Sequence, residues 1–211
     1  MAKKAPSGLR DLDIRRALRL HLSYAHGSEP DTRIIDELGL CQGSARVDLA
    51  VINGSLNGYE IKSERDSLER LPAQQKIYSK ALDTVVVVAS ARHVEALIKA
   101  VPPWWGIWQA EPNNTSMTLT TVHESSDNPD VDPFSVVQLL WRDEALAALE
   151  ARDLDRGLRT KSREVMWSRL ANAVPLPELR HLVRRYLKAR RDWRSDEQQV
   201  SSDVMCLPSS T

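Results

Sequence analysis

Two carboxylates and a lysine stand in a predicted pair of adjacent strands, where a hydrophobic strand has no need of charge. Asp48 lies within ARVDLAVI, and Glu60 and Lys62 lie within the following YEIKS. Side chains alternate between the faces of a strand, so Glu60 and Lys62 share one face while Tyr59 and Ile61 share the other. Carboxylates beside an amine are groups that can bind a metal ion and move a proton.

The turn between these strands sets which residues face each other. Two Asn-Gly pairs bound the turn segment NGSLNG, which favours a hairpin. In the first strand, the apolar residues expected to share a face are Val47, Leu49 and Val51. A loop of odd length centred near Gly54 places Asp48 opposite Glu60, with Cβ atoms about 4.5–5.5 Å apart. Carboxylates this close repel each other, so we expect a divalent cation between them, with Mg²⁺ the first choice and Mn²⁺ an alternative.

Lys62 is expected on the same side as the two carboxylates. Its ammonium can hold the attacking water or stabilise charge that develops on a phosphate. The alternative interpretation is an exposed hairpin face that carries an ordinary Glu–Lys pair.

A helix predicted over DSLERLPAQQKIYSKAL follows the second strand. Gln74 and Tyr78 are four residues apart and therefore lie on one helical face. We expect this face to meet the end of the YEIK strand and to contact substrate. In the alternative interpretation, Tyr78 is a core residue and Gln74 is its neighbour.

The remaining pattern predicts an α/β fold with a C-terminal helical appendage. A helix over 9–25 comes first, and TRIIDELGL is ambiguous between strand and helix. DTVVVVAS is a strand buried on both faces, ARHVEALIKAV is a helix, and WWGIWQA and MTLTTVHES are strands. The step from YEIK through the helix to TVVVV is expected to be a right-handed parallel crossover, which makes the sheet mixed.

Three helices are predicted after the polar segment SSDNPDVDP: one over FSVVQLLWRDEALAALEA, one over SREVMWSRLANAV and one over LPELRHLVRRYLKARRDW. The expected domains are a core at 1–124, a linker at 125–133, a basic helical subdomain at 134–194 and a disordered tail at 195–211. In the last helix, the predicted apolar stripe is Leu179, Leu182, Val183, Tyr186 and Leu187.

The 211-residue chain has no net charge, but its charge is unevenly distributed. Residues 111–155 carry ten acidic and two basic side chains, whereas residues 159–194 carry eleven basic and three acidic ones. The basic segment is suited to contact nucleic acid backbone through Arg180, Arg184, Arg185, Lys188 and Arg191. A helix face paired with the acidic segment, or a protein-binding surface, explains the same pattern.

Other classes of site find little support. The five histidines show no zinc-like spacing, and there is no phosphate-binding P-loop or dinucleotide glycine pattern. Trp104, Trp105 and Trp108 could form a platform that stacks unpaired bases, although packing of a strand on a helix is the commoner use. Two distant cysteines, no apolar run of about 18 residues and no signal peptide indicate a cytoplasmic protein without a membrane segment.

These residues resemble the PD-(D/E)XK nuclease superfamily. The likeness rests on Asp48 and the Glu60-Ile61-Lys62 triplet, and Gln74 with Tyr78 resembles the QxxxY element of its RecB-like branch. It covers about residues 10–110 and implies a restriction-endonuclease-like core, with a mixed sheet flanked by helices. Val47 replaces the proline of the family motif.

The resemblance implies a Mg²⁺-dependent nuclease that hydrolyses phosphodiester bonds, with DNA as the expected substrate. Asp48, Glu60 and the Ile61 carbonyl would bind the metal, Lys62 would assist the attacking water, and Glu37 would complete the site. Gln74 and Tyr78 would contact nucleic acid or the site. It further implies a role in DNA repair, mobile-element biology or defence.

Two other functions stay open. One is a non-catalytic nucleic-acid-binding or adaptor module on the same fold, and the other is a protein-interaction scaffold with a charge-paired surface. A homo-oligomer is compatible with the sequence in each case.

Overall fold

The computed structural model describes residues 9–113 and 116–190, so Arg191 and the tail predicted at 195–211 lie outside the described residues. A six-stranded mixed sheet with strand order β1-β2-β3-β4-β5-β6 forms its centre. The strands are β1 (Arg33–Leu40), β2 (Ala45–Ile52), β3 (Leu56–Lys62), β4 (Thr84–Ser90), β5 (Gly106–Asn113) and β6 (Ser116–His123). Only β3, β4 and β5 pair in parallel, and the other neighbours are antiparallel.

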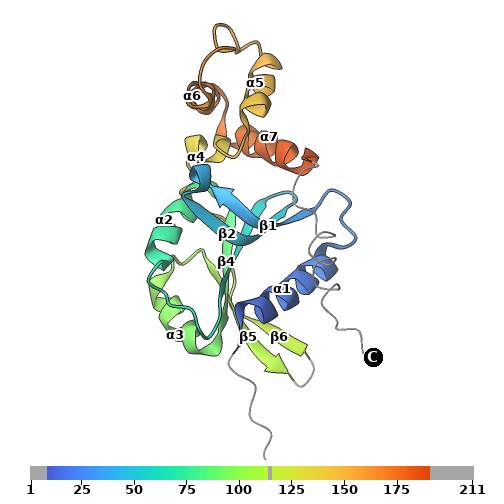
Figure 1. Ribbon diagram of the computed structural model, residues 1–211, viewed down its shortest axis with the longest axis vertical. Helices are drawn as coiled ribbons and strands as arrows, with labels where there is room; N and C mark the ends of the chain where they lie inside the picture. The colour runs from blue at the N-terminus through green and yellow to red at the C-terminus, as the bar shows by residue number, and fades with distance from the viewer. Residues whose placement is uncertain (1–8, 114–115, 191–211) are drawn as a thin grey trace, which may run out of the picture.

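Helices cover both faces of the sheet and one of its ends. In Figure 1, α1 (Asp11–His26) lies on one side of the sheet, and α2 (Leu71–Ala81) and α3 (Ala91–Ala100) lie on the other. Above the sheet stand α4 (Pro133–Val137), α5 (Arg142–Glu150), α6 (Arg163–Ala173) and α7 (Leu176–Ala189). A short 3-10 turn, η1 (Cys41–Gly43), joins β1 to β2. The predicted α/β class and mixed sheet are confirmed.

Two hydrophobic clusters follow from the alternation of side chains along the strands. One face of the sheet buries Leu49, Val51, Tyr59 and Ile61 against Ile14, Leu18 and Leu22 of α1. The opposite face forms a larger cluster that includes α2, α3 and the C-terminal helices. Each fully buried Leu or Val contributes about 1.5–3 kcal/mol. An apolar surface is therefore available to the two crossover helices, which are α2 between β3 and β4 and α3 between β4 and β5.

The ambiguous segment 33–40 is strand β1, at one edge of the sheet. The predicted start of α2 is wrong, because the helix begins at Leu71 and not near Asp66. The Asp66 carboxylate instead accepts hydrogen bonds from the backbone N–H and the hydroxyl of Ser63, at 2.7 and 2.6 Å. Asp66 thus stabilises the turn that leads from β3 into the helix.

The single helix predicted over 134–151 is wrong, because the chain leaves the helix between α4 and α5. Side chains from elsewhere take the carbonyl groups that a continuous helix would use. Trp167 Nε1 donates to the Leu140 carbonyl at 3.1 Å, and Arg190 Nη2 donates to the Leu139 carbonyl at 2.6 Å. Leu139 and Leu140 are also buried, so the break is held by packing as well.

The segment predicted to be a linker is fixed to the core by a buried asparagine. The Asn128 side chain donates to the Ser79 and Leu82 carbonyls, both at 2.7 Å, and its backbone N–H donates to the Asp83 carbonyl. One hydrophobic cluster runs from the sheet into α4, α6 and α7. The domain boundaries stay a prediction. Within the described residues, no helix is long and apolar enough to cross a membrane.

Candidate active site

The β2–β3 hairpin has the predicted register. Ile52 pairs with Leu56 and Leu49 pairs with Tyr59, so the loop has three residues and Gly54 at its centre. Asp48 therefore lies across from Glu60, one position beyond the last paired residues. The backbone ladder ends here, and Asp48 Oδ2 accepts the Ile61 N–H at 2.7 Å.

A third carboxylate extends this pair across strand β1. Asp36 pairs with Leu49 and Leu38 pairs with Val47, so Glu37 lies across from Asp48. We call Glu37, Asp48 and Glu60 the acidic row, since they occupy three neighbouring strands. The exposed fraction of the side chain falls along the row, from 45% for Glu37 through 19% for Asp48 to 4% for Glu60. The row thus opens to solvent at Glu37.

One predicted face assignment is wrong. Val47 belongs to the cluster on the α2 side, whereas Leu49 and Val51 belong to the cluster on the α1 side. Glu37, in the neighbouring strand, has φ of 56°, in the left-handed region that non-glycine residues seldom adopt. In both strands, the alternation of side chains between the two faces of the sheet shifts by one residue where the acidic row crosses the strand.

Glu60 and Lys62 form a buried ion pair, 2.7 Å apart, and each residue is only 3% exposed. Two side chains of α2 complete the arrangement. Gln74 Oε1 accepts from Lys62 Nζ at 3.1 Å, and Gln74 Nε2 donates to Glu60 Oε1 at 2.6 Å. The Tyr78 hydroxyl donates to Glu60 Oε2 at 2.6 Å. The prediction that this helix face meets the end of the YEIK strand is confirmed.

Tyr78 serves the core and the polar network together. Its ring is fully buried and stacks on Trp105, with ring centroids 6.0 Å apart. Burial, followed by the charge of Glu60, raises the pKa of the Tyr78 hydroxyl. The hydroxyl therefore stays protonated and remains a donor to Glu60.

Arg15 of α1 is the site residue that the sequence did not reveal. Arg15 Nη2 lies 2.6 Å from Asp48 Oδ1 and 2.9 Å from Glu37 Oε1, and Nη1 donates to the Asp48 carbonyl at 3.0 Å. Burial lowers the pKa of Arg15, but Asp48, Asp11 and Glu37 outweigh it and leave that pKa raised. The sequence did contain one indication of this role. Arg15 follows Asp11 by four residues and lies beside the apolar stripe of α1, and a long side chain at such a position can extend over the sheet.

The pKa of Asp48 is raised to about 7, chiefly by burial and then by the charge of Glu60. The Ile61 N–H and Arg15 act in the opposite direction. The two facing carboxylates are therefore still poorly compensated, although Arg15 and Lys62 lie beside them. Further positive charge at this point would favour the ionised form of Asp48.

A model of the family described as bacteriophage P4 protein cII matches residues 9–202, which is most of the chain. The chain belongs to this family. It is 34% identical over 116 residues to Protein cII of Enterobacteria phage P4, in a match that covers 55% of this chain and 44% of that protein. The match thus spans less than half of the curated relative's length. A solved structure, a protein of unknown function from Silicibacter pomeroyi, matches with a TM-score of 0.40 and 18% identity, over 76% of this chain and all of that one.

The donors in this cII-family chain are of a type that Mg²⁺ accepts. Within residues 9–113 and 116–190, no group of three or more His, Cys, Asp or Glu side chains is arranged to hold a metal ion. Mg²⁺, however, often takes one or two carboxylates and fills its other positions with water and substrate phosphate. Asp48 and Glu60 would supply the carboxylates. Both oxygens of Asp48 and Oε2 of Glu60 keep a lone pair beyond the hydrogen bonds described here, whereas Oε1 of Glu60 already accepts from both Lys62 and Gln74. The metal role of these residues and of the Ile61 carbonyl stays a prediction.

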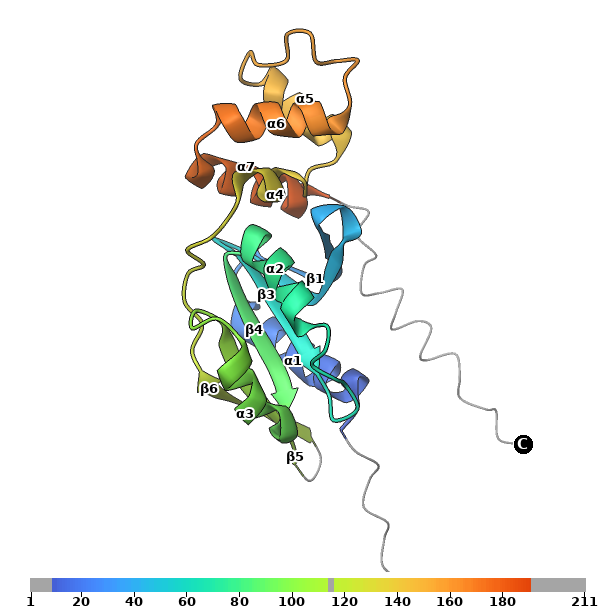
Figure 2. The same ribbon diagram turned by 90° about the vertical axis from the view of Figure 1, so that its left-hand side faces the viewer.

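The basic residues of α7 are not brought to the acidic row. Arg180 Nε and Arg184 Nη1 bind the Asp83 carboxylate at 3.1 and 3.2 Å, and Asp83 Oδ2 also accepts the Leu56 N–H at 2.7 Å. Asp83 and Leu56 mark the beginning of β4 and β3, whereas Lys62 ends β3. Figure 2 shows α7 above the sheet, with β4 pointing away from it. The basic side chains of α7 therefore lie near the start of β3, whereas Glu60 and Lys62 lie near its end.

A basic groove of about 570 Å³ lies between α7 and the β2–β3 turn. Its lining residues, which define the α7 groove, are Asp31, Asn53, Gly54, His181, Arg184, Arg185, Lys188 and Ala189. Lys188 is paired with Asp31, and Arg185 is exposed. A contact of α7 with nucleic acid thus stays a prediction, at a place remote from the acidic row.

The tryptophans of the segment PPWWGIWQA pack mainly against other parts of the protein. Trp104 is 6% exposed and Trp105 is fully buried, and Trp108 packs against Tyr59 and His21. The favoured interpretation, packing, is confirmed for Trp104 and Trp105, which belong to the hydrophobic cluster on the α2 side of the sheet.

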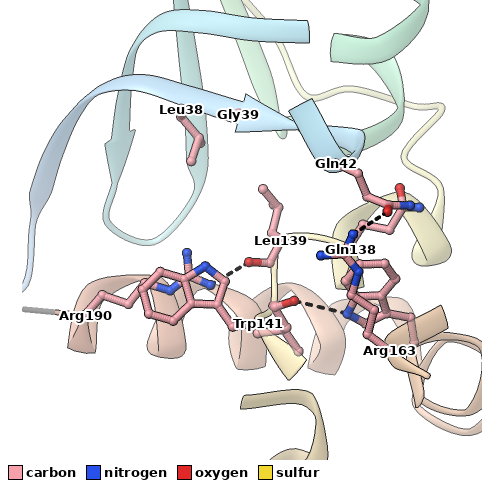
Figure 3. A pocket seen from close by; sticks show the side chains of 10 residues that line it. Leu38, Gly39, Gln42, Gln138, Leu139, Trp141, Arg163 and Arg190 are labelled. Atoms are coloured by element: carbon pink, nitrogen blue, oxygen red, sulfur yellow. Dashed lines mark hydrogen bonds between the residues drawn. The ribbon is translucent and has the colours of Figure 1, made fainter. Parts of the chain in front are cut away.

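An exposed tryptophan lies instead in a smaller cleft of about 260 Å³ between β1 and the C-terminal helices. Figure 3 shows Trp141 beside Arg190 on one side of this cleft, and Arg163 with Gln42 on the other. The Arg190 guanidinium lies 4.2 Å from the Trp141 ring centroid, so one face of the indole is already covered.

Proposed function

We propose that this chain is a Mg²⁺-dependent nuclease with a restriction-endonuclease-like core, and that its substrate is DNA. The observation that carries the proposal is the buried Glu60–Lys62 pair, bound to Gln74 and Tyr78 and facing Asp48 across the hairpin. A fully buried ion pair contributes little to stability compared with apolar residues of the same size. Its presence at the end of a central strand is better explained by chemistry.

Each side chain has a task that its contacts support. Asp48 and Glu60 would hold the metal ion, and Glu37 would bind it indirectly from the exposed end of the acidic row. A bound Mg²⁺ would polarise the phosphate and lower the pKa of its water. Tyr78 and Gln74 hold both oxygens of Glu60, which fixes the direction of that carboxylate.

Lys62 is positioned to assist the attacking water. An ammonium group has three N–H donors, and Glu60 and Gln74 accept two of them. The third donor is left for a water molecule or for an oxygen of the scissile phosphate. Because Lys62 is buried, its charge acts in a medium of low dielectric, where it stabilises a developing negative charge more strongly than in water.

Nucleic acid is the substrate class that the charge distribution supports. Arg185 presents positive charge in the α7 groove, which lies beyond the start of strand β3 from the acidic row. Glu60 is four residue steps of about 3.3 Å from Leu56 at the start of β3, so the groove begins about 13 Å or more from the acidic row. A substrate that touched both places would have to be extended, as a polynucleotide is.

A second candidate function is a nucleic-acid-binding module without catalytic turnover. The observation that favours it is that every oxygen of the two carboxylates already accepts a hydrogen bond from the protein. Arg15 and the Ile61 N–H take the two oxygens of Asp48, and Lys62, Gln74 and Tyr78 take those of Glu60. Such a site is stable without a metal, and binding of DNA would then be independent of Mg²⁺.

A cleavage assay distinguishes the two candidates. Purified protein is incubated with linear, circular and single-stranded DNA, with Mg²⁺ or with a chelator. We expect cleavage with Mg²⁺, none with chelator, and none by Asp48→Asn. Asp143→Asn, the same change at a side chain that is 95% exposed, is the matched control and should cleave normally. Equal cleavage by wild type and Asp48→Asn, or binding of DNA without cleavage in Mg²⁺ and Mn²⁺, would refute the nuclease proposal.

A further inference from the structure

Arg15 occupies the open end of the acidic row. Its Nη2 atom lies within 2.9 Å of both Asp48 Oδ1 and Glu37 Oε1. Asp48 Oδ1 is the oxygen that does not accept the Ile61 N–H. Arg15 therefore holds the Asp48 oxygen that the backbone of β3 leaves open.

The guanidinium is held in place from several directions. Nη1 donates to the Asp48 carbonyl at 3.0 Å, and Asp11, one helical turn earlier, lies 3.5 Å from Nε. The Arg15 side chain is 21% exposed, so its charge is only partly screened by water. Arg15 thus places positive charge directly beside Glu37 and Asp48.

A metal ion and this guanidinium cannot share Asp48 Oδ1 without strong repulsion. Two cations on one carboxylate oxygen lie only a few ångströms apart in a partly buried place, where screening is weak. We propose that Arg15 is a built-in counter-cation, which balances part of the charge of the acidic row in the metal-free protein and must leave Asp48 when a divalent ion binds. This inference rests on the proposed metal site.

Displacement gives Arg15 a second partner. Arg15 belongs to α1, so when it leaves Asp48 it remains at the open end of the row, where an incoming phosphodiester would lie. Guanidinium groups bind phosphate oxygens through paired hydrogen bonds. Nucleic acid would then bind more tightly to the form in which Arg15 has left Asp48. Binding of the metal ion and binding of nucleic acid would therefore strengthen each other.

Calorimetric titration of Mg²⁺ and Mn²⁺ into the full chain without nucleic acid tests this inference. We expect Arg15→Gln to bind either ion roughly tenfold more tightly than wild type, because the competing cation is gone. Arg15→Lys keeps the charge but loses the paired N–H donors of the guanidinium, so its affinity for the ion should lie between those of wild type and Arg15→Gln. Arg16→Gln removes the same charge from the exposed neighbouring position and should bind the ion as wild type does.

The possible failures separate the two proposals. Far-ultraviolet circular dichroism first establishes that each variant is folded. Equal affinities of wild type and Arg15→Gln would overturn the counter-cation, while leaving the metal site intact. Weaker binding by Arg15→Gln would also overturn it, because Arg15 would then be organising the carboxylates for the ion. If neither wild type nor Arg15→Gln bound either ion, the metal site itself would be refuted, and this inference with it.

Discussion

Replacing Lys62 by methionine is expected to reduce Mg²⁺-dependent DNA cleavage at least a hundredfold. Methionine keeps much of the volume of the lysine but removes its charge and its N–H donors. Loss of a single donor that stabilises transition-state charge typically costs about 10²–10³ in rate. Affinity for DNA should change little, because Lys62 is 3% exposed and, in the proposed mechanism, would contact only the reacting phosphate.

The measurement is the single-turnover cleavage rate at saturating protein, with affinity for DNA followed separately by fluorescence anisotropy. Lys99→Met is the matched control, since Lys99 pairs with Glu95 on the surface of α3 with 71% of its side chain exposed. Thermal melting establishes that the variant is folded. A folded Lys62→Met protein that cleaves within threefold of wild type would remove Lys62 from the mechanism.

Replacing Glu60 by alanine is expected to lower the free energy of unfolding by about 3–5 kcal/mol. This change leaves the Lys62 ammonium buried without its carboxylate, and breaking one partner of a buried pair is far more costly than losing the pair. It also removes one acceptor of the Gln74 amide, and leaves the Arg46 carbonyl as the acceptor of the Tyr78 hydroxyl. Unfolding in urea at equilibrium gives the free energy.

A double-mutant cycle separates the ion pair from the rest of the network. Adding Lys62→Met to Glu60→Ala should recover part of the lost stability, because the unpaired charge is removed with its partner. The matched pair is Glu95 and Lys99 on α3, which are 86% and 71% exposed. Glu95→Ala should cost about 0.5 kcal/mol or less. Equal costs for Glu60→Ala and Glu95→Ala would show that the Lys62 ammonium reaches water.

The sequence predicted the sheet best where local pattern and tertiary packing agree. Four consecutive valines form the buried central strand β4, and the three-residue loop centred on Gly54 placed Asp48 across from Glu60. The spacing of Gln74 and Tyr78 correctly placed both on one face of α2. These features depend on the periods of strands and helices, which a sequence displays directly.

Features that depend on distant contacts could not be read from local pattern. Arg15 binds Asp48, which lies 33 positions later in the chain, and no residue near Arg15 in the sequence indicates this partner. The break between α4 and α5 is stabilised by Trp167 and Arg190, which lie later in the sequence. The change of face at Val47 accompanies the left-handed backbone of Glu37 in the neighbouring strand.

The basic helix shows why a run of charge predicts function poorly. The apolar stripe of α7 was predicted correctly, since Leu179, Leu182, Val183 and Leu187 are buried. Composition cannot tell a cation that binds a carboxylate of the core from one that is left for a ligand. Arg180 and Arg184 pair with the buried Asp83, and they are two of the five basic side chains that suggested a phosphate-binding face.

A crystal structure of the full chain with Mn²⁺ tests the central claim most directly, because anomalous scattering locates the ion without assumptions. We expect an anomalous peak within coordination distance of carboxylate oxygens of both Asp48 and Glu60, with the Arg15 guanidinium moved off Asp48. Saturating Mn²⁺ with no peak at these carboxylates, and Arg15 still bound to Asp48, would contradict it.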